Sequence, residues 1–150
     1  MDKTVIIYYS HHHNNTKKLL DAIKAQCQVD LVPVEQAGNI KLENYSKVGF
    51  ASGIYYAKFA DALYSYVVNH KNDLKGKKTF LLATGGGSNN NKALDAFGSL
   101  LNEAQGERLG NYYCNGWDTF GPFKIVGGIR KKHPNEKDCN GAVKFYQSLA

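Results

Sequence analysis

The strongest constraint on the fold is an alternation of short apolar runs with longer stretches whose apolar residues recur at helical spacing. The first run, Thr4–Tyr9, is β-branched or aromatic throughout, which is typical of a parallel strand buried on both faces. The next stretch has helical spacing at Leu19, Leu20, Ile23 and Cys27. Four further strands are predicted at Val29–Val34, Val48–Ser52, Thr79–Thr84 and Leu109–Cys114. This alternation predicts a parallel sheet with helices on both faces.

Helical spacing recurs after the later strands. The predicted buried positions are Phe59, Leu63, Tyr66, Val67 and His70 after the third strand, and Leu94, Phe97, Leu101 and Ala104 after the fourth. A last helix is predicted to begin near Asn135, because Asn135 and Asp138 have the spacing of an N-cap and its partner. Its predicted buried positions are Ala142, Val143, Tyr146 and Leu149.

The number of strands and the chain length narrow the topology. Five strands in 150 residues fit a doubly wound α/β sheet of order 2-1-3-4-5, and the length fits one domain over residues 1–150. Pro33 favours an edge position for the second strand, since proline has no N–H to donate. Such sheets bind ligands at the carboxyl ends of the strands beside the point where the order reverses, here strands 1 and 3. We therefore expect the site in the loops after Tyr9, Ser52, Thr84 and Cys114.

Composition excludes several other classes of protein. Hydrophobic residues make up 43% and charged residues 21%, which is enough for a core and excludes a disordered chain. No apolar run approaches the roughly 18 residues of a membrane-spanning helix, and no signal peptide is expected at the start of the chain. The cysteines, Cys27, Cys114 and Cys139, are odd in number and scattered, so we expect a reduced cytoplasmic protein without a disulfide framework.

The net charge bears on the choice of partners. The chain has 19 Lys and Arg against 13 Asp and Glu, a net charge of +6, with most of the excess in residues 71–150. A solvated surface is the simplest interpretation, and an acidic partner or an anionic ligand is the alternative. No zinc-ligand spacing, recognition-helix signature or aromatic-basic sheet motif indicates nucleic acid, so neither a nucleic acid nor a membrane is an expected partner.

The first candidate loop is Ser10–Thr16, with the sequence S-H-H-H-N-N-T, which leads directly into a helix. Backbone amides at the helix start, the hydroxyls at both ends of the loop and the side chain of Asn15 suit a phosphate. Asn14 suits a left-handed turn, and His12 and His13 are expected to donate to an anion or to line the pocket. The alternatives are a polar turn that only caps the helix, and a metal site, for which no further cluster of ligands has suitable spacing.

Two further loops favour contact with a flat ring. Residues Ser52–Phe59 read S-G-I-Y-Y-A-K-F, so a glycine permits close backbone approach and aromatic side chains are available to pack on the ring. Residues Thr84–Ser88 read T-G-G-G-S and also expose main-chain atoms, without the spacing of a nucleoside-triphosphate or dinucleotide loop. The alternative for the aromatic segment is a turn that belongs to the core.

The connection after the fifth strand has a length of about 20 residues, and loops of this length are often functional. It contains Cys114, the single tryptophan Trp117, Asp118 and the basic cluster Arg130–His133. A buried structural role is favoured for Cys114 over a nucleophile, since no activating neighbour is evident. Asp118 is interpreted as a turn residue rather than a general acid.

Four segments together resemble the flavodoxin family. They are Y-Y-S-H-H-H-N-N-T, G-F-A-S-G-I-Y-Y, C-N-G-W-D-T-F-G-P and G-G-I-R-K-K-H-P-N-E, and they occur in the order expected for its short flavodoxin-domain proteins. The resemblance runs over nearly the whole chain and implies a flavodoxin-like three-layer sandwich. The chain departs from the family at Asn14 and Ala57, where glycine is common, and in its net charge of +6, where an acidic surface is usual.

The resemblance also implies noncovalently bound FMN, with its phosphate in the first loop and its isoalloxazine ring between the second and third. It assigns to Gly53 the peptide that hydrogen-bonds the ring nitrogen N5. The cofactor-binding residues implied are Ser10, His12, His13, Asn14, Asn15, Thr16, Ser52, Gly53, Ile54, Tyr55, Tyr56, Thr84, Gly85, Gly86 and Gly87. No catalytic residue and no metal ligand is assigned, because the flavin performs the chemistry.

We therefore predict a small FMN-binding redox protein that carries one or two electrons between partner proteins, a reductase and an electron acceptor. The net charge favours acidic partners. One alternative is an FMN-dependent NAD(P)H:quinone oxidoreductase, in which Arg130–Lys132 would serve the dinucleotide phosphates. The other is a flavodoxin-like scaffold without a cofactor that only binds partners.

Overall fold

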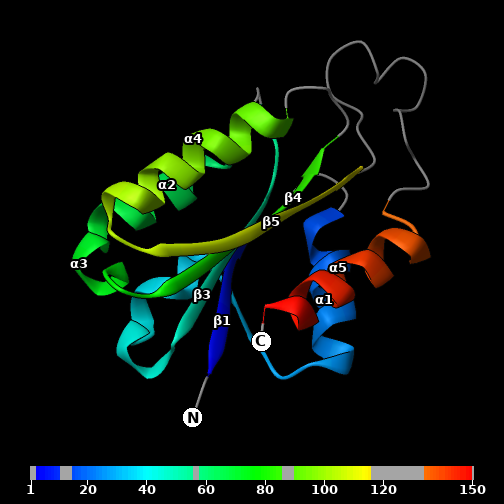
Figure 1. Cartoon of the computed structure of the whole chain (residues 1–150), viewed down its shortest axis with the longest axis horizontal. Coiled ribbons are helices and arrows are strands. Elements are labelled where there is room, and N and C mark those ends of the chain that lie inside the picture. The colour runs from blue at the N-terminus through cyan, green and yellow to red at the C-terminus, as the bar shows by residue number, and fades with distance from the viewer. Residues whose placement is uncertain (1–2, 11–14, 56–57, 86–89, 116–133, 150) are drawn as a thin grey trace.

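The computed structural model describes residues 3–10, 15–55, 58–85, 90–115 and 134–149. Its helices and strands alternate along the chain, as Figure 1 shows. In chain order they are β1 (Thr4–Tyr9), α1 (Asn15–Gln26), β2 (Asp30–Pro33), the 3₁₀ helices η1 (Val34–Asn39) and η2 (Leu42–Asn44), β3 (Lys47–Gly53), α2 (Asp61–Asn69), α3 (Lys71–Leu74), β4 (Lys78–Gly85), α4 (Asn90–Glu103), β5 (Glu107–Asn115) and α5 (Glu136–Ser148).

The five strands form one parallel sheet of order β2-β1-β3-β4-β5, which confirms the predicted fold class. Helices α1 and α5 cover one face of the sheet, and α2, α3 and α4 cover the other (Figure 1). The result is the predicted three-layer arrangement, with one apolar core on each side of the sheet.

Strand β1 explains why its sequence lacks alternation. Val5, Ile6 and Ile7 are all 0% exposed, because the strand lies inside the sheet and both of its faces are covered. Ile6 packs in the core under α1 and α5, whereas Val5 and Ile7 pack in the core under α2 and α4. Strand β2 is at the edge and ends at Pro33, as predicted from that proline.

The segment after β3 differs from the prediction at both ends of its helix. Helix α2 begins at Asp61, so Phe59 is buried beside the helix rather than in it. The Ala60 amide donates to Ser52 Oγ at 3.1 Å, which holds this part of the chain against the end of β3. His70 is only half-buried, since α2 ends there and the ring stacks on Tyr66 with centroids 4.0 Å apart.

Helix α5 begins as predicted. The Asn135 side chain accepts a hydrogen bond from the Asp138 amide, and the Asp138 carboxylate accepts one from the Asn135 amide, each at 2.9 Å. Of its predicted buried positions, Ala142 and Val143 are buried, and Tyr146 and Leu149 pack around the core while staying partly exposed. No helix within the described ranges has the length and apolarity needed to cross a membrane.

Candidate functional site

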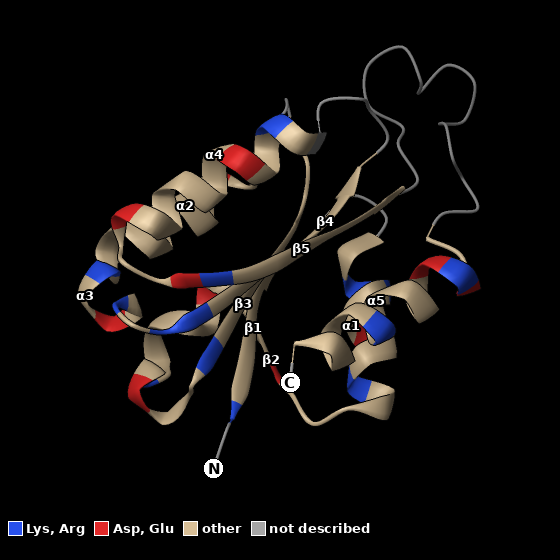
Figure 2. Ribbon diagram, in the orientation of Figure 1, with Lys and Arg blue, Asp and Glu red and all other residues tan. Residues whose placement is uncertain are grey.

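The carboxyl ends of β1, β3, β4 and β5 lie at one edge of the sheet, where α1 begins (Figure 1). Strand β1 has β2 on one side and β3 on the other, so the order reverses here and the loops diverge. Figure 2 shows that the charged residues of the strands lie toward their amino ends. The last described residues of these strands are Tyr9, Gly53, Gly85 and Asn115, all uncharged. The groups available to a ligand at the carboxyl ends of these strands are therefore main-chain atoms and neutral side chains.

The start of α1 is tied to the end of β1 and has no acidic residue in its first turn. Ser10 Oγ accepts a hydrogen bond from the Lys17 amide at 3.2 Å, which holds the end of β1 against the first turn of the helix. That turn contains no acidic residue, so the positive end of the helix dipole is not neutralised from within. Lys17 Nζ pairs with Asp21 at 2.5 Å and lies 5.8 Å from the centre of the Tyr8 ring. Its hydrogen bond to Asp21 raises the pKa of Lys17, so the side chain stays cationic.

Thr16 and Thr84 join α1 to β4 inside the protein. Their Oγ1 atoms share a hydrogen bond of 3.1 Å, and the residues are 2% and 1% exposed. The Thr16 hydroxyl is therefore engaged with the sheet, whereas the sequence analysis assigned it directly to a phosphate. A hydroxyl that donates one hydrogen bond still has lone pairs, and one that accepts still has its proton.

The end of β3 is a tightly hydrogen-bonded turn. Tyr55 and Lys58 exchange two backbone hydrogen bonds, from the Tyr55 amide at 2.7 Å and from the Lys58 amide at 3.1 Å. Ser52 Oγ donates to the Gly53 carbonyl at 2.6 Å, and the Ile54 amide donates to the Thr84 carbonyl at 2.8 Å. The start of the turn is thus fixed to β4 through the Ile54 amide.

Gly53 packs closely against the side chain of Tyr55. A Cβ on Gly53 would lie 2.9 Å from the Tyr55 hydroxyl oxygen, so the phenol occupies the space where a side chain would stand. The Tyr55 ring also packs edge-on against Tyr9, with centroids 6.0 Å apart and planes at 88°. Tyr9, Tyr55 and the partly buried Gly53 lie together at the switch point.

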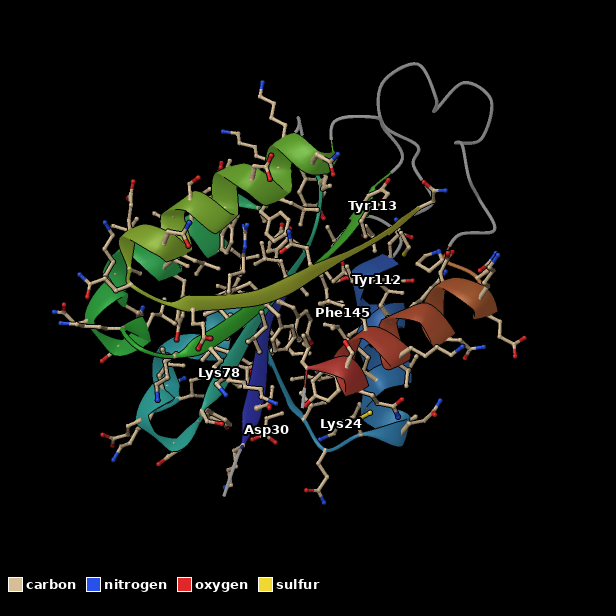
Figure 3. The ribbon with its side chains drawn as sticks, in the orientation of Figure 1. Lys24, Asp30, Lys78, Tyr112, Tyr113 and Phe145 are labelled. Atoms are coloured by element: carbon tan, nitrogen blue, oxygen red, sulfur yellow. The ribbon has the colours of Figure 1, made fainter. Side chains whose placement is uncertain are left out.

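Tyr113 is a member of this edge that sequence reasoning missed. Its hydroxyl donates to the Gly85 carbonyl at 2.8 Å and thereby fixes the last residue of β4 (Figure 3). Neighbouring Tyr112 faces the opposite core and donates to the Asp138 carbonyl at 2.8 Å. Because side chains alternate along a strand, Tyr112 and Tyr113 are expected on opposite faces of the sheet. No sequence signal pairs Tyr113 with Gly85.

The structure brings together nine of the predicted cofactor-binding residues at or beside this edge. They are Ser10, Asn15, Thr16, Ser52, Gly53, Ile54, Tyr55, Thr84 and Gly85. The remaining six lie outside the described residues, as do Trp117, Asp118 and the Arg130–His133 cluster. The six are His12, His13, Asn14, Tyr56, Gly86 and Gly87.

Cys114 has the environment of a structural cysteine. It is 6% exposed at the end of β5, and burial raises the pKa of its thiol far above the ordinary value, with smaller effects of Asp138 and Cys139 in the same direction. A thiol held in its protonated form is a poor nucleophile. Among the residues that the structure describes, no group of three or more His, Cys, Asp or Glu side chains is arranged to hold a metal ion.

Comparison with known proteins agrees with this architecture. Residues 5–111 match the flavodoxin domain family. An uncharacterised protein of Methanocaldococcus jannaschii is 34% identical over 98% of this chain and 97% of its own length.

Two solved structures share the fold at low sequence identity. General stress protein 14 of Treponema denticola, solved in complex with FMN, has a TM-score of 0.71 and 14% identity, with 99% of each chain covered. An NADPH-quinone reductase of P. pentosaceus has a TM-score of 0.65 and 15% identity, with 100% of this chain and 98% of the other covered. The family match, the archaeal relative and the sheet order agree: the chain belongs to the flavodoxin family.

Proposed function

We propose that the chain binds FMN noncovalently at the carboxyl edge of its sheet and carries one or two electrons between partner proteins. The observation that carries this proposal is the start of α1, which contains no acid in its first turn and is hydrogen-bonded to the ends of β1 and β4. A helix start at the switch point of a doubly wound sheet favours a phosphate.

The described residues fit FMN at both of its ends. Ser10, Asn15 and Thr16 surround the start of α1 and would hold the phosphate with the backbone amides of the first turn. At the ring end, Gly53 has no side chain, so a flat ring could approach its backbone. Tyr9 and Tyr55 supply aromatic surface beside it. The remaining positions proposed for the ring are Ser52, Ile54, Tyr56, Thr84, Gly85, Gly86 and Gly87, with His12, His13 and Asn14 beside the phosphate.

These residues suggest which roles belong to the cofactor and which to the chain. FMN supplies the capacity to accept and return electrons. The chain's groups would bind and orient it, and Tyr9 and Tyr55 would supply aromatic surface beside the backbone at the end of β3. This role requires no acid, base or nucleophile, in agreement with the protonated, buried thiol of Cys114. The net charge of +6 supports acidic partner proteins.

The test compares FMN with riboflavin, which lacks the phosphate. Purified apoprotein is titrated with each ligand, and flavin fluorescence gives the dissociation constants. We expect riboflavin to bind about 10- to 100-fold more weakly, as befits the loss of charge-assisted hydrogen bonds. Equal affinities would contradict the phosphate site at α1, and binding of neither ligand would favour the scaffold without a cofactor.

A second candidate is an FMN-dependent NAD(P)H:quinone oxidoreductase. The observation that favours it is the structural similarity to the NADPH-quinone reductase of P. pentosaceus over nearly the whole of both chains. The FMN-loaded protein is mixed with NADPH and a soluble quinone, and NADPH absorbance is followed. Steady turnover without an added reductase supports the enzyme, whereas reduction that occurs only with a reductase supports the carrier.

A further inference from the structure

Thr84 makes two hydrogen bonds, one through its side chain and one through its backbone. Its side chain faces the core under α1, where its hydroxyl is bonded to that of Thr16 at 3.1 Å. Its carbonyl accepts the amide hydrogen of Ile54 at 2.8 Å, just beyond the end of β3. One residue in the middle of the sheet edge therefore touches both the helix proposed for the phosphate and the turn proposed for the ring.

Burial and strand pairing hold Thr84 and both of its hydrogen bonds in place. Thr84 is 1% exposed and is paired in register with Gly53 on β3 and Cys114 on β5, so its backbone has a strand on each side. The next residue, Gly85, is fixed in turn by the Tyr113 hydroxyl at 2.8 Å. A buried hydroxyl pair is also costly to break from one side, because the remaining hydroxyl is left without a partner.

We propose that Thr84 is a positioning residue that holds the phosphate end and the ring end of the flavin site in a fixed relation. The inference rests on the proposed function and changes the role of this residue, which the sequence placed among direct cofactor contacts. FMN spans both ends, so the link favours binding of the whole molecule. Riboflavin engages only the ring end and gains little from it.

The first experiment is a double-mutant cycle on Thr16 and Thr84, read as dissociation constants for FMN and riboflavin. Valine has the shape of threonine without the hydroxyl. We expect Thr84→Val to weaken FMN about tenfold and riboflavin by much less, so that the preference for FMN falls by a similar factor. Thr84→Ser retains the hydroxyl and should restore that preference.

The double variant separates a shared bond from two independent ligand contacts. If the hydroxyls act through each other, Thr16→Val with Thr84→Val weakens FMN about as much as the worse single variant. If the two losses multiply, or if Thr84→Val leaves the preference for FMN unchanged, the positioning role is wrong.

Thr79 supplies a matched control in the same strand. It is also buried, at 0% exposure, and its hydroxyl donates to the Glu107 carbonyl at 3.1 Å, but it lies near the other end of β4. Thr79→Val should lower the free energy of unfolding in the same way as Thr84→Val, with no change in the preference for FMN. If both variants changed the preference for FMN over riboflavin equally, Thr84 would contribute only to stability.

A measurement on the apoprotein keeps this inference distinct from the proposed function. Backbone amide exchange of Ile54 reports the turn after β3, because that amide donates to the carbonyl of Thr84, whose hydroxyl is hydrogen-bonded to Thr16 on α1. Thr16→Val, a change on the helix, should reduce the protection of the Ile54 amide, and Thr79→Val should not. Unchanged protection in Thr16→Val overturns the link. Failure of the wild type to bind either flavin overturns the proposed function and leaves this readout intact.

Discussion

At the scale of single residues, Gly49 on β3 packs closely against Phe80 on β4. The two are paired in register, and a Cβ on Gly49 would overlap the Phe80 ring. That ring has little room to move, since Phe145 and Tyr146 of α5 pack edge-on against it with centroids 6.4 and 5.9 Å away. Glycine at this position is what allows a phenylalanine in the neighbouring strand.

Gly49→Ala should therefore lower the free energy of unfolding by about 1–3 kcal/mol, the usual cost of overpacking a core. Gly38→Ala is the control, because nothing lies within 4 Å of a Cβ built there, and we expect a change within about 0.5 kcal/mol. Urea denaturation measures both. Adding Phe80→Leu should recover part of the loss in Gly49→Ala, and strict additivity of the two changes would contradict the overlap.

At the scale of elements, α5 depends on the reciprocal hydrogen bonds between Asn135 and Asp138 at its start. Asn135→Ala should lower the free energy of unfolding by about 1 kcal/mol, because the Asp138 amide loses its acceptor. Asn140→Ala, an exposed position within the helix, is the matched control and should cost nothing. Asn135→Ser should retain most of the stability, and equal losses in all three variants would show that the cap is not what stabilises the helix.

Sequence patterns predicted those elements that are governed by local chemistry. The burial of β1 on both faces, the edge position of β2 and the start of α5 each follow from residues close together in the chain. The start of α2 was predicted less well, because the Ala60 amide bonds to Ser52, eight residues earlier. In the site, the loops were predictable from their place after the strands. The Thr16–Thr84 bond was not, because it joins residues 68 positions apart through the strand register.

At the scale of the whole molecule, several tyrosines make stability sensitive to alkaline pH. Hydrogen bonding to Asp30 raises the pKa of Tyr45 to about 12, and burial is the main cause that raises the pKa of Tyr66 and of Tyr112 to about 12, from an ordinary 10.0. Below pH 10 these groups are protonated in both the folded and the unfolded chain. Between pH 10 and 12 the unfolded chain loses these protons first, so the free energy of unfolding should fall as the pH rises.

Tyr66→Phe tests this dependence, because the Tyr66 hydroxyl is buried and has no hydrogen-bond partner among the described residues. At pH 7 the variant should be as stable as the wild type or about 1 kcal/mol more stable, since a buried polar group is removed without breaking a bond. Between pH 10 and 12 its decline should be shallower. Urea denaturation at pH 8, 10 and 11 measures both effects, and a parallel decline would exclude Tyr66 as a contributor.

The packing of α5 on α1 has a consequence for how the chain reaches its native state. The Tyr146 hydroxyl donates to the Gln28 carbonyl at 2.9 Å, across a separation of 118 residues, and Ala142 and Val143 complete the core beneath the two helices. On a ribosome, every strand of the sheet is made before α5, the last described element. Until α5 docks, Phe80 and Leu82 on this face of the sheet lack the cover that Ala142 and Val143 supply. Such long-range closure is slow, and the nascent chain is most prone to aggregate in the interval between completing its sheet and closing this face.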